Sequence, residues 1–343
     1  MNTFSRRNFL SSAGLTAAGL ACGSLAAPRV QGSVKPKRSK QEWIQALSGV
    51  HNFMVTPFHS NYELNAEGLR RNIADHARSG TKNMTIVVSG GLGELFTLSV
   101  EEHKSLVTAA VAGAQGKFPV VAGVGGGYKN TLMMARNAEQ VGADAVLVFA
   151  YPLACGDADG EYQYLHDAAT AVSTAVLVYP CGEDDVRINV LKRLAKLPNV
   201  VGFKDSSGGV NVGQSLGSLI GSELLWIAEG EPHAEIAFPA GARAFTTAVA
   251  TFVPEACRKF WQSGASGNLD QMKQVRQTRI DPIIKVRGLK PGYGISGIKV
   301  ALETQGRAGG TVRPPGTQVM EEDRPKIAAI TRKHAEQLRR KGS

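Results

Sequence analysis

Short apolar runs alternate with helical segments over most of this 343-residue chain. From residue 48 onward, runs rich in Val, Ile, Phe and Ala recur, and each is followed by a turn and by a segment with helical periodicity. Eight runs are predicted strands: 49–55, 84–88, 119–123, 145–149, 175–179, 200–203, 224–228 and 244–247. Their starts lie roughly 20 to 35 residues apart, the length of one strand, one helix and two loops. The pattern therefore predicts an α/β protein, a (β/α)8 TIM barrel.

The chain beyond the eighth strand is too long for one closing helix. Helical patterns recur near 254–263, 269–283, 296–305 and 321–340. We therefore expect a barrel over 45–262 and a C-terminal helical extension over 263–343.

The N-terminal residues have the pattern of an export signal. The first 27 contain no Asp or Glu, and Ser5-Arg6-Arg7-Asn8-Phe9-Leu10 precedes a small-residue apolar run that ends at Ala26-Ala27. This combination is typical of a twin-arginine signal, whereas the alternative is a disordered basic N-terminus. We expect a cleaved signal over 1–27, a basic flexible tether over 28–44, and a periplasmic protein. Lipid attachment at Cys22 is disfavoured, because Leu20 is displaced from its usual place in a lipid-attachment box.

Composition limits the class of protein. Apolar residues make up 43% of the chain and charged residues 20%, which suits a large core, and the apolar stretches of the body are too broken to span a bilayer. Disorder and an integral membrane protein are therefore excluded for the body. The net charge is +10, and part of it gathers in 324–341. No aromatic residues interleave there, so a solvated helix end is favoured and no nucleic-acid partner is expected.

Metal and cofactor motifs are missing from the sequence. Cys155, Cys181 and Cys257 lack CxxC spacing and are odd in number, so neither a disulfide framework nor a structural metal site is implied. The glycine cluster at 123–127 lacks GxGxxG spacing and a Walker lysine, and is interpreted as a turn. We expect no metal and no cofactor.

Lys204 is the first candidate for chemistry. It follows the apolar run 200–203 and precedes a Ser- and Gly-rich loop, and in a barrel the carboxyl ends of the strands carry the active site. An amine there can capture a ketone carbon as an imine, provided that the site desolvates it. The alternative is a surface lysine at a strand end.

Other strand ends supply candidate acid, base and binding groups. Tyr151 and Tyr179 follow or end the fourth and fifth runs, and Tyr151 is the preferred proton shuttle; the alternative is a tyrosine packed at the strand end with its hydroxyl in water. The turn Gly90-Gly91-Leu92-Gly93-Glu94 can aim backbone N–H groups at a carboxylate. The remaining candidate substrate-binding residues are Thr56, Thr246 and Thr247, at the ends of the first and eighth runs.

Four ordered landmarks carry a family resemblance. They are Val55-Thr56-Pro57-Phe58, Gly93-Glu94 followed by Leu98-Ser99 and Glu101-Glu102-His103, Tyr151, and Gly202-Phe203-Lys204-Asp205. Over roughly 48–335 the chain resembles the dihydrodipicolinate synthase and N-acetylneuraminate lyase superfamily of Schiff-base class I aldolases. The resemblance implies that Lys204 forms the imine, that Tyr151 shuttles the proton, and that the 90–94 turn holds the carboxylate of an α-keto acid. It also implies a homo-oligomer, a dimer or tetramer.

Within that superfamily the sequence is most similar to the 5-dehydro-4-deoxyglucarate dehydratase branch. The stretches that carry this likeness are 91–98, 245–254 and 290–315. The resemblance implies a carbon–oxygen hydro-lyase that removes water and CO2 to give 2,5-dioxopentanoate. Two departures stand out: Leu92 replaces a usual threonine, and Thr251 replaces an asparagine of this branch.

Two other functions remain open from the sequence. One is an aldolase of the dihydrodipicolinate synthase or N-acetylneuraminate lyase kind, which would use the same imine. The other is an exported barrel that binds a sugar acid without turning it over.

Overall fold

The computed structural model describes residues 38–151 and 156–340. The predicted export signal, Cys22, Cys155 and most of the predicted tether lie outside the described residues. None of the helices in the described part is long and apolar enough to cross a membrane.

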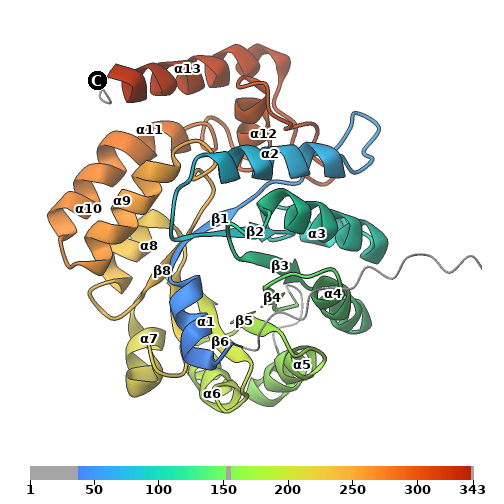
Figure 1. The fold of residues 1–343 in the computed structure, drawn as a ribbon, viewed down its shortest axis with the longest axis vertical. Helices are drawn as coiled ribbons and strands as arrows, with labels where there is room; N and C mark the ends of the chain where they lie inside the picture. Colours follow the sequence, from blue (N-terminus) through green and yellow to red (C-terminus); the bar gives the residue numbers. More distant parts are fainter. Residues whose placement is uncertain (1–37, 152–155, 341–343) are drawn as a thin grey trace, which may run out of the picture. The chain divides into compact units, whose positions relative to one another are not determined.

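Eight parallel strands close into a ring in chain order (Figure 1). They are β1 Gly49–Phe53, β2 Met84–Val88, β3 Val120–Val124, β4 Ala145–Phe149, β5 Ala175–Tyr179, β6 Val200–Asp205, β7 Leu225–Ala228 and β8 Ala244–Thr247. The ring closes between β1 and β8, where Val50 pairs with Phe245. Nearly every strand residue is buried, because the barrel core lies on one face and the helices on the other. The predicted TIM barrel is confirmed.

Helices cover the outside of the ring in the same order as the strands (Figure 1). They are α2 Ala66–Arg78, α3 Val100–Ala114, α4 Tyr128–Gln140, α5 Ala158–Thr170, α6 Asp184–Leu194, α7 Asn211–Leu216, α8 Gly230–Ala237 and α9 Pro254–Ala265, with the short 3-10 turns η1 Leu95–Thr97 and η2 Gly217–Leu219. Side-chain caps define the starts of α2, α3 and α5. Ser99 and Glu102 form a reciprocal capping box at α3, as expected of Ser followed three residues later by Glu.

A helix also precedes the barrel, and it corrects the predicted tether. Helix α1 spans Lys40–Leu47, begins with a capping box of Ser39 and Glu42, and buries Ile44. Lys40 Nζ donates to Ala195 O at 2.7 Å and to Glu223 Oε2 at 3.0 Å. The flexible-tether prediction is therefore wrong for residues 40–44. The capping box of Ser39 and Glu42 and the burial of Ile44 stabilise a helix there despite the basic residues.

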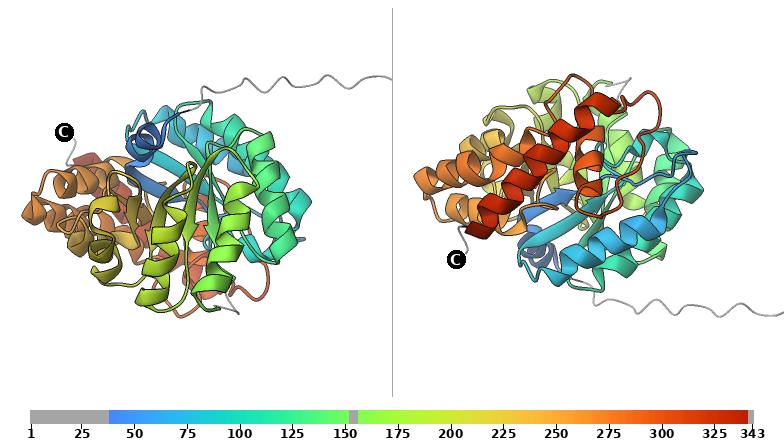
Figure 2. Two further views of the ribbon diagram at one scale, coloured as in Figure 1. Left: turned by 90° about the horizontal axis from the view of Figure 1, so that it is seen from below. Right: turned by 90° about the horizontal axis from the view of Figure 1, so that it is seen from above.

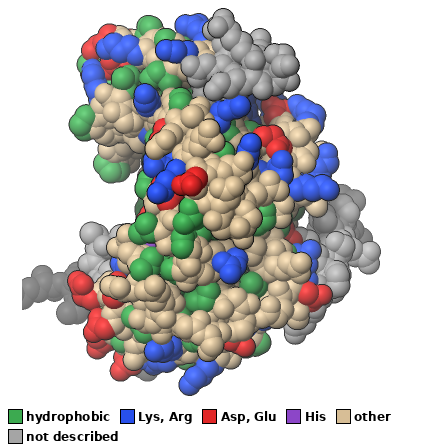
Figure 3. Space-filling view, turned by 90° about the vertical axis from the view of Figure 1, so that its left-hand side faces the viewer, with side chains coloured by type: hydrophobic (Ala, Val, Ile, Leu, Met, Phe, Trp, Pro, Cys, Tyr) green, Lys and Arg blue, Asp and Glu red, His purple; other side chains and the backbone are tan. Residues whose placement is uncertain are grey.

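The C-terminal extension is helical, as predicted. It contains α10 Leu269–Val275, the π-helical turn η3 Arg276–Ile280, α11 Asp281–Ile284, α12 Ser296–Glu303, the 3-10 turn η4 Glu321–Asp323 and α13 Arg324–Arg340. Helix α13 packs along α11 and α12 at one edge of the molecule (Figures 1 and 2). On the face drawn in Figure 3, basic and acidic side chains are interspersed. That mixture favours a solvated surface there.

Candidate active site

Lys204 lies buried at the carboxyl end of β6, with only 6% of its side chain exposed. Its Nζ is 2.8 Å from Glu229 Oε1 and 3.9 Å from the ring centroid of Tyr179. These partners come from the two neighbouring strand ends, since Tyr179 is the last residue of β5 and Glu229 directly follows β7. The barrel thus encloses a desolvated amine between a carboxylate and an aromatic face. Such burial is what the imine hypothesis requires of the site.

The strand end beneath this amine is held by buried hydrogen bonds. Asp205 accepts from Trp226 Nε1 at 3.0 Å and from the Ser207 amide at 2.9 Å. The Glu229 amide donates to Asp205 O at 3.1 Å and to His233 Nδ1 at 3.2 Å. Because Nδ1 accepts, the proton of neutral His233 sits on Nε2, which lies 2.7 Å from Gly209 O. The backbone that carries Glu229 is therefore anchored to β6 and to the loop after it.

Of the two candidate tyrosines, Tyr179 is the one that contacts Lys204. Its ring packs edge-on against Phe149, with centroids 5.4 Å apart. Tyr151 is 40% exposed and forms no hydrogen bond or ring contact within the described ranges. It stands two residues past the end of β4, whereas Tyr179 ends a strand adjacent to β6. The assignment of the proton shuttle to Tyr151 stays a prediction.

The 90–94 turn keeps free donors at the barrel mouth. Thr56 Oγ1 donates to Gly93 O at 2.6 Å, which ties the turn to the chain after β1. The Glu94 amide bonds back to Gly91 O, so the turn is closed. The amides of Gly91 and Leu92 donate to no other group among the described residues. These two N–H groups suit a ligand carboxylate, and the Leu92 side chain adds only apolar surface.

The other candidate hydroxyls are already engaged. Thr246 Oγ1 accepts from the Gly230 amide at 3.0 Å, and Thr247 Oγ1 donates to Glu231 Oε1 at 2.6 Å. Burial raises the pKa of Glu231, and the Thr247 hydrogen bond acts against that shift. Both threonines therefore position the start of α8. Their contact with substrate stays a prediction.

A buried ion pair behind the turn was missed by the sequence reasoning. Glu94, which has a left-handed backbone with φ 55°, lies 2.5 Å from Nζ of Lys299, a residue of α12 with no exposed surface. Lys299 also donates to Thr311 O, and the Arg313 amide donates to the second Glu94 oxygen at 2.8 Å. Burial lowers the pKa of the Lys299 ammonium, and Glu94 opposes that shift. The C-terminal extension thus clamps the turn that faces the mouth.

Arg313 extends this clamp to α3. Its guanidinium pairs with the Glu102 carboxylate, with Nη1 2.8 Å from Oε2, and this pairing lowers the pKa of Glu102. The stretch 290–315 stood out in the sequence for its family likeness alone. In the sequence, the available signal was a lysine between apolar residues of a predicted helix: Lys299 lies between Ile298 and Val300. A lysine buried in such a position needs an acidic partner, which here is Glu94.

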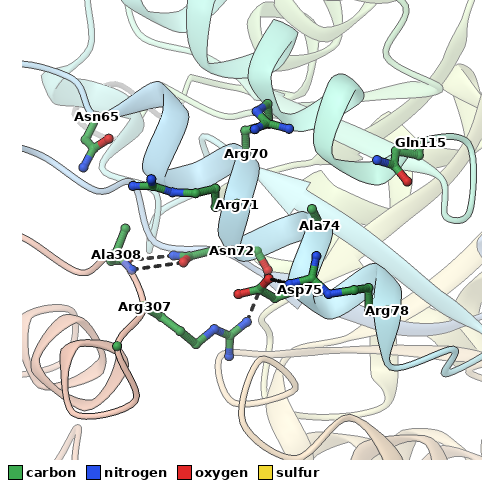
Figure 4. Close-up of a pocket in the computed structure, with 11 residues that line it drawn as sticks. Asn65, Arg70, Arg71, Asn72, Ala74, Asp75, Arg78, Gln115, Arg307 and Ala308 are labelled. Carbon is green, nitrogen blue, oxygen red and sulfur yellow. Dashed lines mark hydrogen bonds and ion pairs between the residues drawn. The ribbon is translucent and has the colours of Figure 1, made fainter.

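An arginine-rich groove lies outside the barrel mouth. It has a volume of about 700 Å³ and runs between α2 and the loop at 306–308 (Figure 4). Arg70 pairs with Glu67, and Arg78 pairs with Asp75, each within α2. Arg307 donates to the main-chain carbonyls of Thr251 and Asn72. Most of its cations therefore have internal partners, and the groove is separate from the candidate chemistry at Lys204.

The structure describes the state of two cysteines and the arrangement of potential metal ligands. Cys181, just after β5, is disulfide-bonded, and Cys257 is a free buried thiol whose pKa is raised by burial. Across 38–151 and 156–340 there is no group of three or more His, Cys, Asp or Glu side chains that could hold a metal.

Comparison with known proteins identifies the relatives of this chain. Residues 46–334 match the model of the dihydrodipicolinate synthetase family. A probable 5-dehydro-4-deoxyglucarate dehydratase of Bacillus licheniformis is 31% identical over 299 residues, which cover 86% of this chain and 92% of the relative. The protein of that name from Bacillus subtilis is 30% identical, with 87% and 98% covered.

Solved structures agree on the fold. Dihydrodipicolinate synthase from Oceanobacillus iheyensis superposes with a TM-score of 0.75 at 23% identity, covering 86% of this chain and 98% of that one. The synthase from Bacillus clausii gives a TM-score of 0.75 at 25% identity, with 85% and 99% covered.

Removal of the buried cation should destabilise the protein. We expect Lys299→Met to lower the free energy of unfolding by about 3 to 5 kcal/mol, because Glu94 would keep a buried charge with no counter-ion. Denaturant unfolding of the purified protein measures this. The double variant Lys299→Met, Glu94→Gln is the control and should recover part of the loss. A double variant less stable than the single one would contradict the argument.

A hydroxyl at position 92 should strengthen carboxylate binding. We expect Leu92→Thr to tighten binding of pyruvate and of a six-carbon keto-diacid, by at most about 1.5 to 3 kcal/mol, the usual worth of a hydrogen bond to a charged group. Calorimetric titration of both proteins measures the difference. Weaker binding of both ligands by the variant would remove the carboxylate site from this turn.

Proposed function

Because the chain belongs to the dihydrodipicolinate synthetase family, we propose that it is a carbon–oxygen lyase that acts through an imine between Lys204 and the ketone carbon of an α-keto sugar acid. The observation that carries the proposal is the buried Lys204 amine, held between Glu229 and the ring of Tyr179 at the barrel mouth. The iminium nitrogen is itself an electron sink, so the proposed chemistry requires no metal and no organic cofactor.

The substrate that we propose is 5-dehydro-4-deoxyglucarate. Relatives at about 30% identity over most of the chain have the name of the dehydratase for this compound. The imine nitrogen would draw electrons from the neighbouring C–H bond, and the enamine formed would expel the next hydroxyl as water. Loss of CO2 from the distal carboxyl, protonation at carbon and hydrolysis of the imine by water would then release 2,5-dioxopentanoate and restore the Lys204 amine.

The proposed roles follow from the arrangement of the side chains. Because the ring of Tyr179 packs on the reacting amine, we propose that its hydroxyl, not its ring, moves the proton between the substrate carbon and the departing hydroxyl. The amides of Gly91 and Leu92 would hold the carboxylate next to the ketone. Thr56 would keep that turn in place through its bond to Gly93.

We also propose that the protein is exported to the periplasm and that it forms the homo-oligomer typical of its family. The twin-arginine pattern supports export, and so does the disulfide at Cys181, because disulfides persist mainly in oxidising compartments. Cell fractionation of the full chain should find the mature protein in the periplasm. The variant Arg6→Lys, Arg7→Lys should stay in the cytoplasm, and periplasmic recovery of both in equal amounts would contradict this route.

Borohydride trapping with pyruvate tests the covalent step. We expect the parent protein to gain a reduced pyruvate adduct on Lys204, visible by intact and peptide mass spectrometry. Lys204→Ala should gain none, yet should keep its fold, because one strand-end lysine contributes little to so large a core. An adduct-free parent would support a non-catalytic sugar-acid-binding barrel. Aldol cleavage products from the keto-diacid would point to an aldolase instead.

The two tyrosines can be compared directly. We expect Tyr179→Phe to lower kcat by about 10² to 10⁴, the usual worth of a positioned acid or base, with much of the binding kept. Tyr151→Phe is the matched variant and should stay close to the parental rate, because its hydroxyl has no partner among the described residues. Steady-state kinetics on 5-dehydro-4-deoxyglucarate measure both. The reverse ranking would return the proton shuttle to Tyr151.

A further inference from the structure

Glu229 touches the reacting amine and has no role in the chemistry described so far. Its Oε1 lies 2.8 Å from Lys204 Nζ, and its side chain is 47% exposed at the rim of the barrel. Its backbone is fixed by the bonds to Asp205 and His233, so the carboxylate is held over the end of β6. Glu229 is thus a carboxylate in contact with the amine on one side and with solvent on the other.

Imine formation requires two proton transfers near this amine. An ammonium cannot attack a ketone until it gives up a proton, and the carbinolamine that forms must gain a proton before its hydroxyl leaves as water. Among the described residues, Nζ forms one ion pair, with the Glu229 carboxylate, and one ring contact, with Tyr179. The ring presents its face, which accepts no proton. The one contacting group that can accept and return a proton is therefore Glu229.

We propose that Glu229 is the acid–base residue of imine formation at Lys204. Its carboxylate accepts a proton from the Lys204 ammonium, and the neutral amine forms the new C–N bond with the ketone carbon. The amine proton passes to the ketone oxygen, which becomes the carbinolamine hydroxyl. The protonated Glu229 then donates to this hydroxyl, the C–O bond breaks, and water leaves the iminium and a restored carboxylate.

This role differs from that of Tyr179 and rests on the proposed function, since it presupposes an imine at Lys204. Glu229 would serve the steps at nitrogen, and Tyr179 those at the substrate carbon and its hydroxyl. A carboxylate that acted only as a counter-ion would have the opposite effect. It would stabilise the ammonium form, so its removal would speed the attack on the ketone.

The experiment measures the rate at which the imine forms with pyruvate. Parent and variant are mixed with pyruvate, sampled over time into borohydride, and the reduced adduct is quantified by intact mass. Glu229→Gln keeps the size of the side chain but removes the base, and Glu229→Asp restores a carboxylate. The matched control is Glu223→Gln, because Glu223 is also 47% exposed and also pairs with a lysine, Lys40, at 3.0 Å. Far-ultraviolet circular dichroism and thermal midpoints check the folds.

We expect Glu229→Gln to slow adduct formation by about 10² to 10⁴ and to reach the same final extent of labelling. Glu229→Asp should recover part of the rate, and added formate should accelerate Glu229→Ala. Glu223→Gln should match the parent. A gain of speed in Glu229→Gln, an unchanged rate, or failure of both Asp and formate to restore any rate would overturn the inference.

The outcomes also separate this inference from the proposed function. A parent protein that forms no adduct with pyruvate overturns both. A parent that forms the adduct at the same rate as Glu229→Gln leaves the imine at Lys204 intact and overturns the role of Glu229 alone. If the Glu223→Gln control slowed adduct formation equally, the slowing would come from the change of net charge alone. That result would also overturn the acid–base role of Glu229.

Discussion

The pairing of β1 with β8 is the constraint on which the rest of this structure depends. Once the parallel sheet closes, all eight carboxyl ends lie on one rim, and short strands of four to six residues suffice to bring distant segments together. Tyr179, Lys204 and Glu229 follow one another at intervals of 25 residues in the chain, yet they meet at adjacent strand ends. The candidate chemistry follows from the direct parallel pairing of β5, β6 and β7 within this ring.

The second level of organisation is the clamp between the barrel and its C-terminal extension. Lys299 and Glu94 form an ion pair inside the protein, and the Arg313 amide completes the coordination of the carboxylate. A buried pair of this kind contributes little net free energy, but the loss of either partner is costly. It therefore fixes the position of the 90–94 turn more than it adds to stability. The amides of Gly91 and Leu92, which donate to no group among the described residues, belong to a turn that the extension anchors through Glu94.

At the barrel mouth, the Lys204 amine contacts an aromatic ring and a carboxylate. The Tyr179 ring and the surrounding core shield Lys204 from water, while the Glu229 carboxylate contacts both the amine and solvent. Desolvation favours a nucleophilic amine, and an ion pair favours an ammonium. Because Glu229 is half exposed at the rim, it contacts the amine without placing a second fully buried charge in the mouth.

The sequence alone determined the strands of the barrel and the position of Lys204. Continuous apolar runs define the strands, because a barrel strand is buried on both faces, and Lys204 is evident as a charge at the end of such a run. Three features were decided only by the tertiary structure. Tyr179 rather than Tyr151 contacts the amine, Glu229 lies against it, and Lys299 finds Glu94. Local patterns specify which residues must be buried, whereas the contacts between side chains on different strands depend on the register and closure of the whole ring.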